Sequence, residues 1–125
     1  MRTHDSVLSL CSISDTEDRI VAGLAGGYAD VITRVYNEGH EGRPSSFVNE
    51  SVTLIKEAGY INKVVLSERG DEIILACEKG LYIQPLNPNK TGLLPATDEI
   101  YLRGQLVSQV FEYSPNKLIA CGFRD

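Results

Sequence analysis

Apolar residues in this chain occur in short bursts separated by polar turns, and the turns contain pairs such as Gly26-Gly27 and Lys79-Gly80. No glycine- and proline-free window of eleven or more residues keeps apolar positions at helical spacing. Bursts of this length between turn residues predict strands. The ten predicted strands are Val7–Ile13, Arg19–Leu24, Tyr28–Val35, Ser51–Ile55, Ile61–Ser67, Glu72–Glu78, Leu81–Leu86, Glu99–Arg103, Leu106–Tyr113 and Lys117–Phe123. The sequence therefore predicts an all-β fold.

The longest connection, residues 36–50, is polar apart from Phe47-Val48 and exceeds the usual loop length of about 4–6 residues. Phe47 either packs against the following strand or is exposed for contact with a partner. Because loops on rigid scaffolds commonly carry recognition, this connection is a candidate protein-contact site. Its candidate contact residues are Glu38, His40, Arg43 and Phe47.

An internal repeat is anchored on Ala22, Ala76 and Ala120, each preceded by two aliphatic residues and followed by a small residue. The repeated order is strand, polar turn, strand with small residues, glycine turn and strand. A period of about 45–55 residues with four strands per unit is typical of β-propeller blades. We expect Ile74–Cys77 to be buried on both sheet faces, and Leu118–Cys121 to be equivalent to it. A β-sandwich is the alternative fold.

The stretch Ser51–Leu86 and the start of another unit at Gly104–Asp125 resemble the WD40-like propeller family. Ser114-Pro115-Asn116 matches a turn that is frequent in that family. The chain has Gly59-Tyr60 where the family often has Gly-His, and it contains no tryptophan, so the family's hydrogen-bond network is not carried over. The segment around Leu75–Tyr82 also looks like citron-homology propellers.

These repeats predict a single propeller segment over residues 1–125, with blade-like units 7–55, 61–103 and an incomplete 106–125. Propellers close with 4–8 blades, so two and a half blades are expected to be a fragment of a longer chain.

Charge limits the classes of partner that are expected, and the cysteine content indicates the compartment. Lysine and arginine number 12 against 17 acidic residues, with no basic block, so neither a nucleic-acid partner nor an anionic membrane is expected. No uncharged run is longer than the ten residues of Ile20–Ala29, which is too short to span a bilayer, and no signal-peptide pattern is found. Three widely spaced cysteines, Cys11, Cys77 and Cys121, fit free buried thiols in a reducing, cytoplasmic compartment.

No nucleophile, base and orienting residue form a catalytic pattern, so the chain is not expected to be an enzyme. His40 has no second histidine nearby, and neither a metal nor a cofactor is expected. Resemblance to the WD40-like family implies a non-catalytic scaffold that binds a protein or peptide, with Tyr60 and Lys79 as further contact residues. The alternatives are a self-contained β-sandwich binding module and a regulatory propeller of a larger multidomain enzyme such as a kinase.

Overall fold

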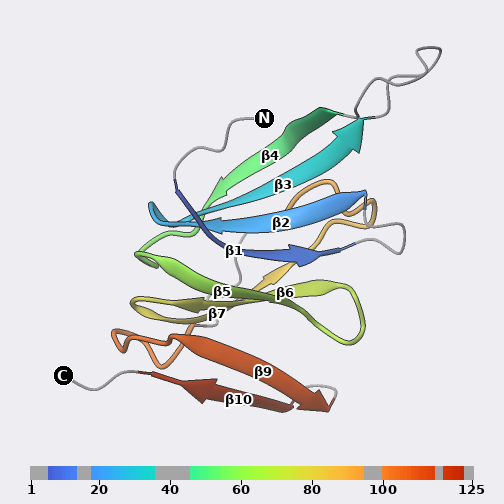
Figure 1. Ribbon diagram of the computed structural model, residues 1–125. Helices are drawn as coiled ribbons and strands as arrows, with labels where there is room; N and C mark the ends of the chain where they lie inside the picture. The colour runs from blue at the N-terminus through green and yellow to red at the C-terminus, as the bar shows by residue number, and fades with distance from the viewer. Residues whose placement is uncertain (1–5, 14–17, 36–45, 95–99, 115–116, 123–125) are drawn as a thin grey trace.

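The computed structural model describes residues 6–13, 18–35, 46–94, 100–114 and 117–122, except the side chains of Ile119 and Cys121. The described residues contain strands and turns and no helix, which confirms the all-β prediction (Figure 1). The strands are β1 (Val7–Ser12), β2 (Arg19–Leu24), β3 (Tyr28–Val35), β4 (Ser46–Leu54), β5 (Ile61–Leu66), β6 (Glu72–Cys77), β7 (Gly80–Pro85), β8 (Ile100–Tyr101), β9 (Gln109–Ser114) and β10 (Lys117–Cys121).

The strands form three antiparallel sheets in which each strand pairs with its neighbours in sequence. The first sheet has the order β1-β2-β3-β4, and the second has the order β5-β6-β7-β8. The third is the hairpin β9-β10. The turns between β2 and β3 and between β6 and β7 are only a few residues long, because Gly27 and Gly80 adopt positive φ values of 86° and 146°.

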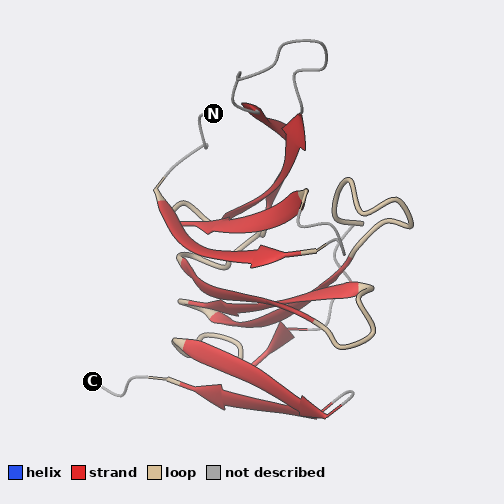
Figure 2. Cartoon of the chain, turned by 45° about the vertical axis from the view of Figure 1, so that its right-hand side comes forward, coloured by secondary structure: helices blue, strands red, loops and turns tan. Residues whose placement is uncertain are grey.

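The sheets are stacked face to face, with the hairpin at one end of the stack (Figure 2). β5 packs on β1 and β2 of the first sheet, and β9 packs on β5 and β6 of the second. The first strand of each sheet therefore lies against the first strand of the next.

The core between the first and second sheets is apolar and supplied by alternate residues of each strand. Val21 and Val31 of the first sheet meet Leu75 and Tyr82 of the second, and these residues are buried. Gly23 lets the sheets approach, since a methyl group added there would lie 2.5 Å from Ile61 Cγ2 and 2.7 Å from the nearest methyl of Val64.

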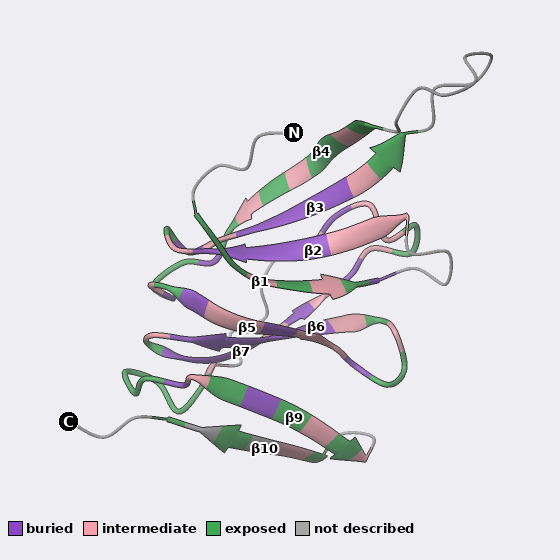
Figure 3. Cartoon of the chain, in the orientation of Figure 1, coloured by how far each residue is buried: buried purple, intermediate pink, exposed green. Residues whose placement is uncertain are grey.

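A smaller core lies on the opposite face of the second sheet, where Ile74, Ala76 and Leu81 pack against Val107 and Val110. The middle strands β2, β3, β6 and β7 carry most of the buried positions, whereas the hairpin is largely exposed (Figure 3).

The burial expected for Ile74–Cys77 is confirmed, whereas the burial expected for Leu118–Cys121 is not. Residues Ile74–Cys77 are all at most 2% exposed, as predicted. In contrast, Leu118 is only half-buried and Ala120 is exposed, because both line an open cavity between the hairpin and the second sheet. The expected burial of Leu118–Cys121 is therefore wrong for these two residues.

The repeat anchors also differ in orientation. Ala22 belongs to a cluster on the face of the first sheet that points away from the second sheet, together with Leu24 and Ile32. Ala76, in contrast, lies on the face of the second sheet that points toward the next layer, the hairpin. A one-residue offset reverses the face of a strand residue, so the alignment of Ala22 with Ala76 is displaced by one position.

The fourth strand begins five residues earlier than predicted. β4 starts at Ser46, so Phe47 and Val48 are strand residues that pair with Arg34 and Thr33 of β3. The polar residues Ser46, Asn49 and Glu50 concealed the strand in the sequence, because an outermost strand exposes much of its surface.

Candidate functional site

Four connections meet along one edge of the stack. They are residues 25–27, 55–60, 78–79 and 102–106, which we call the turn edge (on the left in Figure 1). The Ile55 N–H donates to the Gly27 carbonyl at 2.8 Å, and the Lys79 N–H donates to the Ala58 carbonyl at 3.0 Å. The Gly104 N–H donates in turn to the Lys79 carbonyl at 2.9 Å. Backbone hydrogen bonds thus tie connections of different sheets into one unit.

The turn edge also concentrates left-handed backbone conformations. Two non-glycine residues there have positive φ, Glu57 at 65° and Leu102 at 54°. Gly59 has φ 71°, and a side chain at this position would collide with Glu78. Such conformations are uncommon for non-glycine residues and persist where surrounding contacts fix them. The hydrogen bonds between the connections supply that constraint.

A shallow pocket of about 280 Å³ opens on the turn edge, lined by Glu57, Lys79, Tyr82, Arg103 and Gly104. Arg103 Nη1 lies 3.5 Å from Glu57 Oε2, and both side chains are more than 60% exposed. Burial raises the pKa of Tyr82 above its ordinary value, and the nearby carboxylate of Glu57 raises it further. The pocket therefore combines a neutral phenol with two cations and one carboxylate, which suits hydrogen bonding to a polar ligand.

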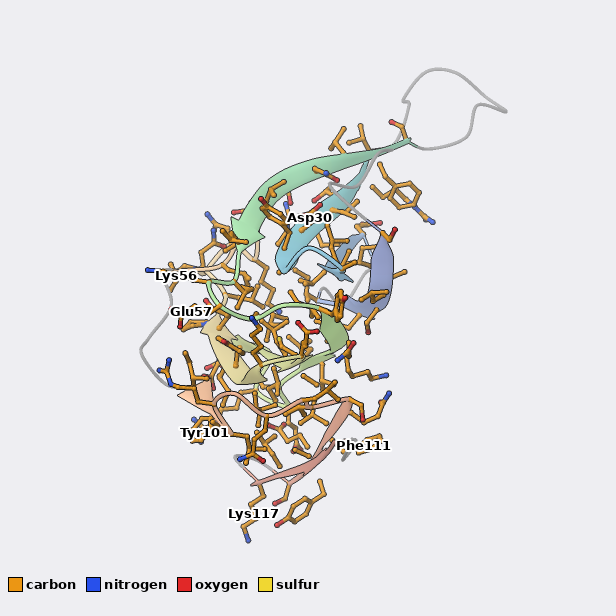
Figure 4. The ribbon with its side chains drawn as sticks, turned by 90° about the vertical axis from the view of Figure 1, so that its left-hand side faces the viewer. Asp30, Lys56, Glu57, Tyr101, Phe111 and Lys117 are labelled. Atoms are coloured by element: carbon orange, nitrogen blue, oxygen red, sulfur yellow. The ribbon has the colours of Figure 1, made fainter. Side chains whose placement is uncertain are left out.

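Tyr60 and Lys79 were predicted as contact residues, and the structure places both on the turn edge. The Glu78 N–H donates to the Tyr60 carbonyl at 2.8 Å, which holds the two segments together. The Tyr60 side chain is 50% exposed. Lys56 and Glu57 project from the same edge (Figure 4). Because Tyr60 and Lys79 both lie on the turn edge, we take this edge, and not the connection before β4, as the candidate site.

Sequence reasoning missed Glu57 and Arg103. They are 46 residues apart and meet only because β8 runs antiparallel to β7 and brings the chain back to the turn edge. Glu57-Ala58-Gly59 carries a turn signal in its glycine, but nothing in the sequence shows that Arg103 faces it.

Phe47 is separated from the other candidates. It lies seven residues before the end of β4, which at about 3.3 Å per residue places it more than about 20 Å from the turn edge. Its ring is half-buried against the Ala22, Leu24 and Ile32 cluster. The Arg34 guanidinium lies 5.5 Å from the ring centroid, within the range of a cation–π contact. The other three candidates, Glu38, His40 and Arg43, lie outside the described residues.

The edge opposite the turn edge carries a polar network. Arg19 Nε donates to Glu50 Oε2 at 2.8 Å and to Thr33 Oγ1 at 3.2 Å, and Thr33 Oγ1 donates to Glu50. The hydrogen bond from Arg19, assisted by the one from Thr33, lowers the pKa of Glu50. Arg19 Nη1 also donates to the Asn89 carbonyl at 3.3 Å, which links the first sheet to the β7–β8 connection. These contacts join β2, β3 and β4 and are structural.

Cys11 and Cys77 are free thiols that face the apolar core. Burial raises the pKa of Cys11 to about 11 and that of Cys77 to about 12. A thiol needs its thiolate form to act as a nucleophile, so these two are inert near neutral pH.

Asp30 is a fully buried carboxylate that the sequence did not single out. Its Oδ2 accepts a hydrogen bond of 3.5 Å from Asn49 Nδ2 of the neighbouring strand, and Figure 4 shows it within the first sheet.

No protein-family model matches this chain, and no curated protein shows significant similarity to it. Within the described ranges, no three His, Cys, Asp or Glu residues are grouped so that they could hold a metal ion. The same ranges include no helix with the length and apolarity needed to cross a membrane.

Proposed function

We propose that this chain is a segment of a WD40-like β-propeller that acts as a non-catalytic scaffold and binds a protein or peptide. Two four-stranded antiparallel sheets with strands in consecutive order support this interpretation, because propeller blades have this topology. Packing of β1 on β5 and of β5 on β9 supports it further, since the innermost strands of successive blades are neighbours.

The alternative β-sandwich agrees less well with the sheet order. Sandwiches usually join their two sheets by Greek-key connections, in which strands of one sheet are not all consecutive. Here each sheet is completed before the next begins, and three layers rather than two are stacked.

The turn edge is the proposed binding surface. The observation that carries this proposal is its construction, in which hydrogen-bonded connections of different sheets hold exposed Lys79 and Arg103 around one pocket, with the exposed Tyr60 on the same edge. A partner binding there meets side chains that are already positioned, so little ordering entropy opposes association. Tyrosine and arginine are also enriched among residues that dominate binding energy.

Peptides selected from a random display library on the intact chain test this proposal. Lys79→Ala with Arg103→Ala should weaken the selected peptides by about tenfold or more, equivalent to about 1.4 kcal/mol. The matched control is Tyr113→Ala with Lys117→Ala, two exposed residues of the hairpin. Equal binding by the turn-edge variant, at unchanged thermal stability, would contradict the proposal.

A further inference from the structure

The pocket on the turn edge lies in the middle of the stack. Its lining residues come from the connections before and after the second sheet, from the turn between β6 and β7, and from β7 itself. The second sheet has the first sheet on one side and the hairpin on the other (Figure 1). The pocket is therefore built between layers that the structure describes and does not depend on either end of the stack.

The turn edge is positively charged within an acidic chain. Its charged residues are the cations Lys56, Lys79 and Arg103 and the carboxylates Glu57 and Glu78, which leave a net charge of +1. The chain as a whole has a formal net charge of −5. An anionic group is therefore attracted to this edge more strongly than to the rest of the surface.

Tyr82 supplies a hydrogen-bond donor inside the pocket. The residue is 4% exposed, and it belongs to the core between the first and second sheets. The charges of Glu57 and Arg103 both act on its phenol, so the hydroxyl lies near the charged residues of the pocket. This hydroxyl makes no hydrogen bond to a residue that the structure describes. Buried tyrosine hydroxyls usually have a hydrogen-bond partner, so a ligand in the pocket would complete this one.

The backbone positions both cations of the pocket. The Lys79 N–H donates to the Ala58 carbonyl, and the Lys79 carbonyl accepts from the Gly104 N–H. The Arg103 guanidinium lies 3.5 Å from the Glu57 carboxylate, but exposed ion pairs of this kind contribute little to stability. The guanidinium can therefore turn toward an incoming carboxylate, which it would bind through two parallel N–H donors.

We propose that this pocket receives one carboxylate side chain, an aspartate or a glutamate, from the partner peptide. Lys79 and Arg103 pair with the carboxylate, and the Tyr82 hydroxyl donates a hydrogen bond to it. The lining contains two cations and one carboxylate, so a single further negative charge neutralises it. A phosphate carries about two negative charges at pH 7 and would leave excess negative charge beside Glu57. The step rests on the proposed function, because the partner must first bind the turn edge.

The probes are peptides selected from the random display library on the intact chain and then synthesised with both ends capped. They should share one aspartate or glutamate. Fluorescence anisotropy should show that replacing this residue by its amide weakens binding by about tenfold or more, because charged hydrogen bonds are lost. Replacing it by phosphoserine should not strengthen binding.

Tyr82→Phe removes only the hydroxyl and keeps the ring in the core, so the thermal stability should not change. It should weaken the acidic peptide by about fivefold or more, and it should reduce the difference between the acid and its amide. Tyr113→Phe is the matched control, since this tyrosine of the hairpin is 62% exposed and should leave the affinity unchanged. Glu57→Gln removes the opposing carboxylate and should favour the phosphoserine peptide relative to the acidic one.

Selected peptides without a shared acidic residue, equal binding of acid and amide, or unchanged affinity for Tyr82→Phe would each overturn the carboxylate assignment. Tighter binding of phosphoserine than of the acid by the unsubstituted chain would overturn it as well. If such peptides still shift the amide resonances of the turn edge, the proposed function stands and only the chemistry of its ligand is wrong. If they bind elsewhere, both proposals fail.

Discussion

At the residue scale, close contact between the sheets depends on Gly23. Gly23→Ala reduces the backbone flexibility of the unfolded chain. In the folded chain, however, the added methyl group would lie within 2.7 Å of Ile61 and Val64. Overpacking of this kind costs about 1–3 kcal/mol, so we expect the free energy of unfolding measured in urea to fall by that amount. In an Ile61→Ala background the same substitution should cost less, because the shortened side chain leaves room. An equal cost in both backgrounds would contradict the contact.

The buried thiols make a prediction about pH. Because burial raises the pKa of Cys77 to about 12, the unfolded chain ionises this thiol first, near its ordinary pKa of about 8.5. The stability that the neutral thiol contributes is complete below about pH 8.5 and is lost as the pH rises toward 12. The slope approaches about 1.4 kcal/mol per pH unit.

Urea denaturation between pH 8 and 11 measures this slope. Cys77→Ala should be less stable at every pH because it leaves a cavity, yet its stability should fall less steeply above pH 9 than that of the unsubstituted chain. Identical slopes would show that the thiol ionises equally in both states.

At the element scale, most strands were predictable because buried runs between turn residues need no knowledge of their partners. β6 and β7 were found in this way, since an uninterrupted apolar run such as Ile73–Cys77 is typical of a strand covered on both faces. β4 was shortened in the prediction because Asn49 and Glu50 face solvent and interrupt any apolar pattern. A polar strand at the outside of a sheet resembles a loop in the sequence.

The position of Phe47 within β4 leads to a second stability prediction. Phe47→Ala removes a half-buried ring from the cluster of Ala22, Leu24 and Ile32, and we expect a loss of about 1–3 kcal/mol in the free energy of unfolding. Binding of the selected peptides should be retained, because the turn edge is more than about 20 Å away.

The matched control is Val48→Ala, on the other face of β4 and 46% exposed, which should change stability by less than about 0.5 kcal/mol. Unchanged stability with weakened peptide binding in Phe47→Ala would instead support the loop patch with Glu38, His40 and Arg43.

At the scale of the whole molecule, the sequence indicated strands and a repeat but could not show which connections meet. Tyr60 and Lys79 were marked from their place in the repeat, whereas Glu57 and Arg103 required the path of the second sheet to bring them together. The displaced alignment of Ala22 and Ala76 could not be seen in the sequence either. The sheet face on which each residue lies is set by strand pairing and by turns of unequal length.

The measurement that tests the central claim most directly is nuclear magnetic resonance mapping of a selected peptide on the intact, isotope-labelled chain. The account predicts that the amide shifts that change most belong to the turn edge, at Glu57–Tyr60, Lys79 and Arg103–Gly104, because these connections form one hydrogen-bonded surface. Changes confined to the first sheet around Phe47, or to the exposed face of the hairpin around Phe111 and Tyr113, would contradict it.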